Sequence, residues 1–145
     1  QSRTSVALAK ILFKQFWKKE VEFLNATEGY INQINGNTAG IIIGDRALVN
    51  LDTFEHIYDL GLAWKAYSGL PFVFAAWVAN KPIPFEFIEA FDAANGYGLS
   101  HLEDVIALIP AIEQVYDLHK YYTENISYEL TPEKKAGLGK FLEAL

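Results

Sequence analysis

Apolar residues near the N-terminus recur at the spacing of one helical face. They follow a run of hydroxyl side chains that could cap a helix start, and they are Val6, Ala9, Leu12, Phe13, Phe16 and Trp17. Spacing of three and four residues places such side chains on one side of a helix. The pattern predicts a helix from about Thr4 to Lys18, capped by the preceding hydroxyls.

The rest of the first half alternates short apolar runs with helical patterns. Runs rich in β-branched or aromatic residues predict strands at 21–24, 39–43, 57–58 and 72–78. Helical spacing predicts helices at 27–34 and 60–67, with Thr27 and Asp59 as their caps. The run at 72–78 is the strongest strand signal, because only a sheet covered on both faces tolerates an unbroken apolar strand. This alternation predicts an α/β fold.

The second half is predicted to be mainly helical. Helical periodicity covers 85–94, 102–109 and 112–122, and a final helix begins after Thr131 with Pro132 at its first position. Ser100 and Glu103 have the spacing of a capping box, and a last strand is possible at 127–130. We therefore expect an α/β unit over residues 1–80, followed by a helical tail over 81–145.

Composition narrows the class of protein. The chain has 145 residues, 51% of them hydrophobic and 21% charged, which excludes disorder as the main state and favours one core. Its net charge of -6 argues against nucleic acid as a partner, and no apolar run is long enough to insert into a membrane. The absence of cysteine excludes disulfides and fits a cytoplasmic location. The absence of methionine, with Gln1 first, predicts that the chain is part of a longer protein.

Three places along the chain are candidates for ligand binding. Ser2, Arg3, Thr4 and Ser5 would bring hydroxyls, a guanidinium and free amides to a helix start, which suits a carboxylate or phosphate, although they could equally be ordinary capping residues. Gly44 and Asp45 follow a predicted strand, where ligands of α/β sheets bind, but they also fit a tight turn with Asp45 as a helix cap. Phe72 lies in an aromatic run that suits a pocket wall or the core.

The three histidines give no sign of a metal site. His56 lies in an acidic stretch, and His101 and His119 fall on predicted helices, but none has a second ligand at a metal-binding spacing. We expect no metal and no cofactor.

Several longer stretches resemble a known family. They are SRTSVALAKIL at 2–12 and DLGLAWKAYSGLPFVFAAWVA at 59–79, supported by IIIGDRAL at 41–48, GLSHL at 98–102 and YYTENISYELTPEKKAGLGKF at 121–141. They resemble the chorismate dehydratases of the futalosine route to menaquinone. The resemblance implies the two-lobed fold of type II periplasmic binding proteins, here the second lobe over residues 1–80, whose strand at 72–79 crosses back, followed by the tail. The tail would pack on a missing N-terminal lobe, and a homodimer is the other expected way to cover its apolar faces.

The resemblance also implies a reaction. Chorismate loses water to give 3-[(1-carboxyvinyl)oxy]benzoate, so the site must hold a small dicarboxylate, and the residues expected to do so are Ser2, Arg3, Thr4, Ser5, Gly44, Asp45 and Phe72. The catalytic base is unknown and is expected on the missing lobe or on the substrate itself, so this chain alone is expected to be inactive. The alternative is a noncatalytic solute-binding lobe that recognises a small carboxylate.

Overall fold

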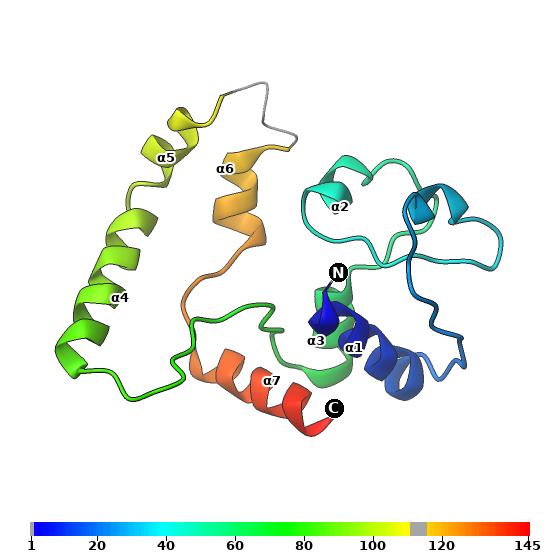
Figure 1. Cartoon of the computed structure of the whole chain (residues 1–145), viewed down its shortest axis with the longest axis horizontal. Helices are drawn as coiled ribbons and strands as arrows, with labels where there is room; N and C mark the ends of the chain where they lie inside the picture. The colour runs from blue at the N-terminus through cyan, green and yellow to red at the C-terminus, as the bar shows by residue number, and fades with distance from the viewer. Residues whose placement is uncertain (1, 111–115) are drawn as a thin grey trace. The chain divides into compact units, whose positions relative to one another are not determined.

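The computed structural model describes residues 2–110 and 116–145, and within these ranges the regular structure is helical (Figure 1). The helices are α1 (Arg3–Ile11), continued by a π-helical segment (Leu12–Phe16), a 3-10 turn (Tyr30–Gln33), α2 (Asp45–Val49), α3 (Leu60–Ser68), α4 (Phe85–Leu99), α5 (Leu102–Leu108), α6 (Leu118–Lys120), continued by a second π-helical segment (Tyr121–Asn125), and α7 (Pro132–Glu143). They form two compact units. Unit 1 holds the residues up to Ala75 together with Leu130–Leu145, and unit 2 holds Ala76–Glu129.

Unit 1 is organised around a small core where α1, α3 and α7 meet (Figure 1). Its buried hydrophobic residues are Leu8, Ile11, Leu12, Trp64 and Phe141. Trp64 is completely buried, and its ring meets Phe141 edge-on with centroids 6.0 Å apart. Helix α7 comes close to the chain after α3, since a Cβ at Gly137 would overlap the Pro71 carbonyl oxygen. A helix from each end of the chain thus packs on the central helix α3.

Three helix starts of unit 1 confirm predicted caps. The Ser2 hydroxyl accepts a hydrogen bond from the Ser5 amide at 3.1 Å, and the Asp59 carboxylate accepts one from the Leu62 amide at 2.8 Å. Thr131 caps α7 by accepting from the Lys134 amide, with Pro132 in the first turn as expected. Such side chains satisfy amides that have no partner within the helix. These are local interactions, which is why the sequence alone predicts them.

The predicted α/β fold is wrong. None of the proposed strands at 21–24, 39–43, 57–58, 72–78 and 127–130 is present among the described residues, which contain no sheet. The structure therefore does not fit a lobe of a type II periplasmic binding protein. A strand needs a second strand to pair its backbone groups, and an apolar run does not specify that partner. In the strongest candidate, Phe72 and Phe74 pack together at 4.6 Å, whereas Trp77 and Val78 are exposed.

Other local expectations also need correction. Residues 27–34 form only the short 3-10 turn, which follows Gly29 in a left-handed conformation with φ of 73°, so Thr27 caps no α-helix. The capping box is absent, because the Ser100 hydroxyl donates to the Tyr97 carbonyl oxygen and α5 has no side-chain cap. The helix predicted at 112–122 lies partly outside the described residues, and its described part forms α6 and the π-helical segment that follows.

Unit 2 contains α4, α5 and α6 and has no fully buried side chain among its described residues. Helix α4 is longer than predicted and leaves Phe85 and Phe87 exposed. Phe91 meets the Trp77 ring edge-on at 5.4 Å. Contiguous exposed apolar surface is uncommon on isolated proteins. From the sequence, we expect a missing lobe or a second copy of the chain to cover the tail's apolar faces, and this stays a prediction.

Candidate functional site

The start of α1 is the predicted binding element whose side chains bond to one another. Ser2 is half-buried and acts as the N-cap, while Ser5 is buried. The Ser5 hydroxyl donates to the Ser2 hydroxyl oxygen at 3.0 Å, in addition to the bond from the Ser5 amide. Two of the four predicted side chains are therefore joined to each other by the fold of the first turn.

The remaining donors at this helix start have no partner among the described residues. The backbone amides of Arg3 and Thr4 have no acceptor there, and the exposed Arg3 guanidinium forms no ion pair there. Amides at a helix start point along the axis, and the helix dipole adds partial positive charge at this end. The site can therefore offer two backbone donors and one cation to an anion.

Gly44 and Asp45 form the start of α2. Gly44 is the N-cap, with φ of 62° and ψ of -150°, a conformation that is open to glycine and costly for other residues. Asp45 is exposed in the first turn of α2, so it is not the cap that the alternative interpretation required. The strand expected before these residues is absent, so no sheet edge positions the carboxylate.

Phe72 lies at the edge of the unit 1 core. It is half-buried, and its ring contacts Phe141 at 4.9 Å and Trp64 at 5.7 Å. From the sequence, Phe72 could be a pocket wall or part of the core, and these ring contacts are those of a residue packed against the core. No hydrogen bond or ion pair between described residues links the α1 start, the α2 start and Phe72 into one pocket. Their joint role in binding stays a prediction.

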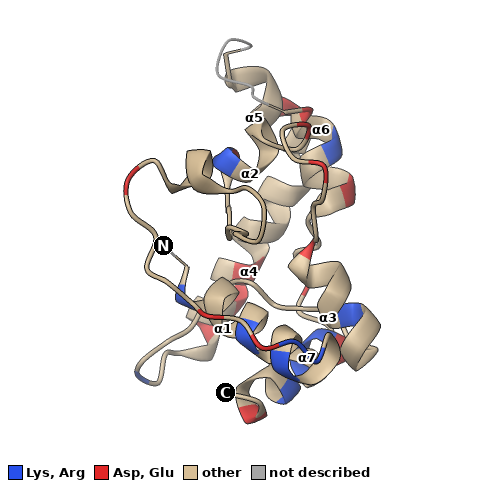
Figure 2. Cartoon of the chain, turned by 90° about the vertical axis from the view of Figure 1, so that its right-hand side faces the viewer, with Lys and Arg blue, Asp and Glu red and all other residues tan. Residues whose placement is uncertain are grey.

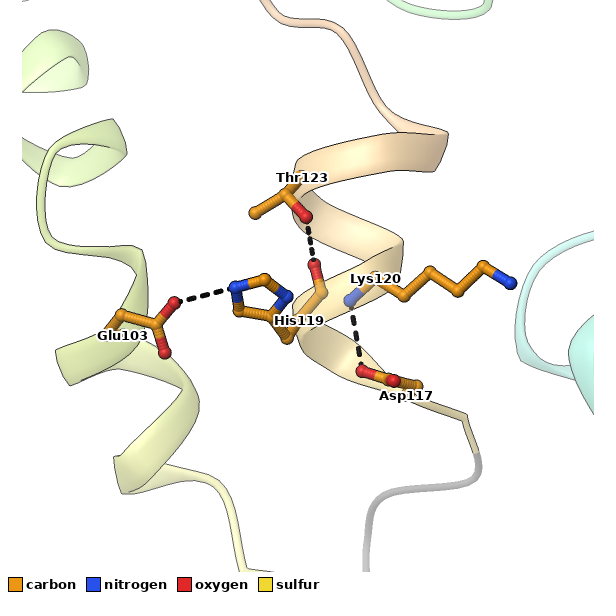
Figure 3. A network of polar contacts seen from close by, with 5 residues as sticks. All are labelled: Glu103, Asp117, His119, Lys120 and Thr123. Carbon is orange, nitrogen blue, oxygen red and sulfur yellow. Dashed lines mark hydrogen bonds and ion pairs between the residues drawn. The ribbon is translucent and has the colours of Figure 1, made fainter.

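The histidines take part in local polar contacts. In unit 2, the His119 Nε2 atom lies 3.0 Å from Glu103, and the network of Figure 3 continues through the Thr123 hydroxyl, which donates to the His119 carbonyl oxygen at 2.8 Å. The Lys120 amide donates to Asp117 at the start of α6. The partners of His119 are thus on α5 and on its own helix, and over the described ranges no three potential metal ligands gather.

One surface feature was not found by the sequence patterns. A hollow of about 540 Å³ lies beside the end of α1 and is lined by Lys10, Phe13, Lys14, Lys18, Lys19, Glu20, Val21 and Phe23. The signal that could have revealed it is the density of lysines in KILFKQFWKK at 10–19, which is unusual in an acidic chain.

In residues 2–110 and 116–145, no helix is both long and apolar enough to cross a membrane.

The comparisons with known proteins identify the family. All of residues 1–145 match the model of a family described as menaquinone biosynthesis, so the chain belongs to that family. Over 173 aligned positions it is 30% identical to the chorismate dehydratase of Thermus thermophilus. The match includes all of this chain and 60% of that protein, so the chain spans less than two thirds of the relative's length. No solved structure matches the chain.

Proposed function

We propose that this chain is part of a chorismate dehydratase, a hydro-lyase that converts chorismate to 3-[(1-carboxyvinyl)oxy]benzoate and water in the cytoplasm. Family membership and the named relative support the class of reaction. The structural observation that carries the proposal is the α1 start, where the Arg3 and Thr4 amides and the Arg3 guanidinium have no partner in the described part of the chain.

In this proposal the α1 start anchors one substrate carboxylate. Two backbone N–H groups donate to its oxygens, and the Arg3 guanidinium adds a charged hydrogen bond. The Ser2–Ser5 hydrogen bonds fix the first turn, so these donors are positioned before the ligand arrives. Ser2 and Ser5 thus act mainly as positioning residues for the anchor.

The reaction requires little more than orientation and proton transfer. The ring carbon that bears the enol ether loses its proton, the hydroxyl on the adjacent carbon leaves, and the two together make one water. The ring becomes aromatic, which drives the reaction forward. A site for this reaction holds the carboxylates in place and limits competing routes, with modest acid–base assistance.

A titration with chorismate tests the anchor directly. We expect the backbone amide resonances of Arg3 and Thr4 to shift in ¹H–¹⁵N spectra of the chain as chorismate is added. Binding to an exposed helix start is weak, with a Kd of about 1 mM, and weakens further with added salt. Shifts that leave Arg3 and Thr4 unchanged while other amides respond would show that the carboxylate binds elsewhere.

A further inference from the structure

The hollow beside the end of α1 is open to solvent and has the volume of a small-molecule site. Its volume of about 540 Å³ falls within the range of roughly 300–1,000 Å³ that is usual for such sites. It is built within unit 1, from the end of α1, the π-helical segment and the chain that follows to Phe23. Lys and Arg positions are visible in blue along α1 in Figure 2.

The charge of this hollow is opposite to that of the chain. Its lining contains the ammonium groups of Lys10, Lys14, Lys18 and Lys19 against the single carboxylate of Glu20, in a protein of net charge -6. None of the four lysines forms an ion pair within the described residues. Uncompensated like charges repel one another unless an anion lies between them. The hollow therefore favours a ligand that carries more than one negative charge.

The apolar part of the lining favours a flat ring. Phe13 and Phe23 meet edge-on at 6.0 Å, and Phe23 is more than a third exposed. The Lys10 ammonium lies over the Phe23 ring, 5.3 Å from its centroid. The two phenylalanine rings can pack against an aromatic ring of a ligand, and the neighbouring ammonium groups can pair with its anionic substituents.

The backbone at the edge of the hollow is unusual. The helix widens to π-helical geometry at Leu12–Phe16, and such segments often occur at functional sites. Lys18 then adopts a left-handed conformation with φ of 52°, and it is the one residue other than glycine with a positive φ among the described residues. Glycine is the usual residue at such a helix end. A lysine at this position is more strained in its backbone than glycine would be, but it adds an ammonium group to the lining of the hollow.

We propose that this lysine-lined hollow is a second binding site, for a small aromatic dicarboxylate. It is separate from the carboxylate anchor, because Lys14 is twelve residues from Ser2, or about 18 Å along a helix. The inference goes beyond the proposed function and does not depend on it. An anionic membrane surface would meet the same lysines, but the Phe13 and Phe23 rings in the lining and the net negative charge of the chain favour a small ligand.

The test uses benzene-1,3-dicarboxylate as the probe, with benzoate, cyclohexane-1,3-dicarboxylate and inorganic phosphate for comparison. We expect the dicarboxylate to shift the amide resonances of Lys14, Lys18 and Phe23 and to bind about tenfold more tightly than benzoate. The cyclohexane compound tests the ring, and phosphate tests charge alone. Equal affinity for all four compounds, or no shift at these amides, would overturn the proposal.

The Lys18→Gly variant separates binding from stability. Glycine relieves the left-handed conformation, so we expect Tm to rise by about 2–4 °C while affinity for the probe falls several-fold. Lys14→Gln should lower affinity without the rise in Tm. The matched controls are Lys65→Gln and Lys135→Gln, which remove exposed charges that do not line the hollow.

Two further outcomes complete the test. Unchanged affinity in both Lys18→Gly and Lys14→Gln would overturn the proposal. Binding to phosphatidylglycerol vesicles that is lost in these variants, with no binding of the dicarboxylate, would instead assign the lysines to a membrane surface. A Ser2→Asp variant should leave the dicarboxylate affinity at this hollow unchanged, so failure here is distinguishable from failure of the anchor at α1.

Discussion

Replacing Ser2 by aspartate is expected to reduce chorismate binding at the α1 start by about a hundredfold or more. Aspartate is as good an N-cap as serine and should keep the hydrogen bond from the Ser5 amide, so the helix and its stability are retained. Its carboxylate would stand where the substrate carboxylate is proposed to bind, and close like charges cost several kcal/mol. The measurement is the chorismate titration of the Arg3 and Thr4 amide resonances, in which binding should become too weak to detect in the variant, with Tm recorded on the same samples.

The control for this substitution is Thr131→Asp. Thr131 caps α7 in the same way, so the change adds the same charge at another helix start and preserves a cap. It should leave chorismate affinity within about twofold of the original. A Ser2→Asp protein that keeps its affinity would show that the α1 start does not hold the carboxylate.

Trp64→Ala is expected to lower the free energy of unfolding of the unit 1 core by about 3–5 kcal/mol. The indole is fully buried and contacts Tyr67, Phe72 and Phe141, so its removal leaves a cavity that helices from both ends of the chain line. Domains of this size are commonly stable by only about 5–15 kcal/mol, so this one change removes a large share. Urea unfolding followed by circular dichroism measures the loss.

Trp77→Ala is the matched control, because the Trp77 side chain is 82% exposed. The same substitution at this exposed position should lower the free energy of unfolding by less than about 1 kcal/mol. Comparable losses in the two variants would mean that Trp64 is not the centre of the core. Trp64→Phe should recover part of the stability, because the Trp64 Nε1 atom, which phenylalanine lacks, has no hydrogen-bond partner among the described residues.

Three helix caps are the interactions that the sequence predicted well, whereas the caps expected at Thr27 and Ser100 are absent. Asp59, Thr131 and Ser2 cap helices within one turn of themselves, and the helices at 3–11, 60–68 and 132–143 follow from them. The strand predictions were wrong because strand pairing depends on residues far apart in the chain. An apolar run such as 72–78 can instead pack at the edge of a core without forming a strand. Likewise, the contact of Phe141 with Trp64 joins positions too far apart in the chain for any local pattern to indicate.

The candidate site shows the same division. The donors of Arg3 and Thr4 follow from a helix start that local spacing defines, whereas the placement of Gly44 and Asp45 relied on a strand that the structure lacks. The lysine-lined hollow was missed because it depends on how the chain turns back after Lys18 to bring Phe23 beside Lys10. Periodicity does not describe such a turn.

The most direct measurement of the central claim is dehydration of chorismate by a fusion protein. In this fusion the chain replaces the matching residues of the Thermus thermophilus chorismate dehydratase, whose own activity is the positive control, and circular dichroism verifies folding. The expected result is loss of chorismate with stoichiometric appearance of 3-[(1-carboxyvinyl)oxy]benzoate, greatly slowed by Ser2→Asp and unaffected by Thr131→Asp. A folded fusion that consumes no chorismate, or one that Ser2→Asp leaves fully active, would contradict the account.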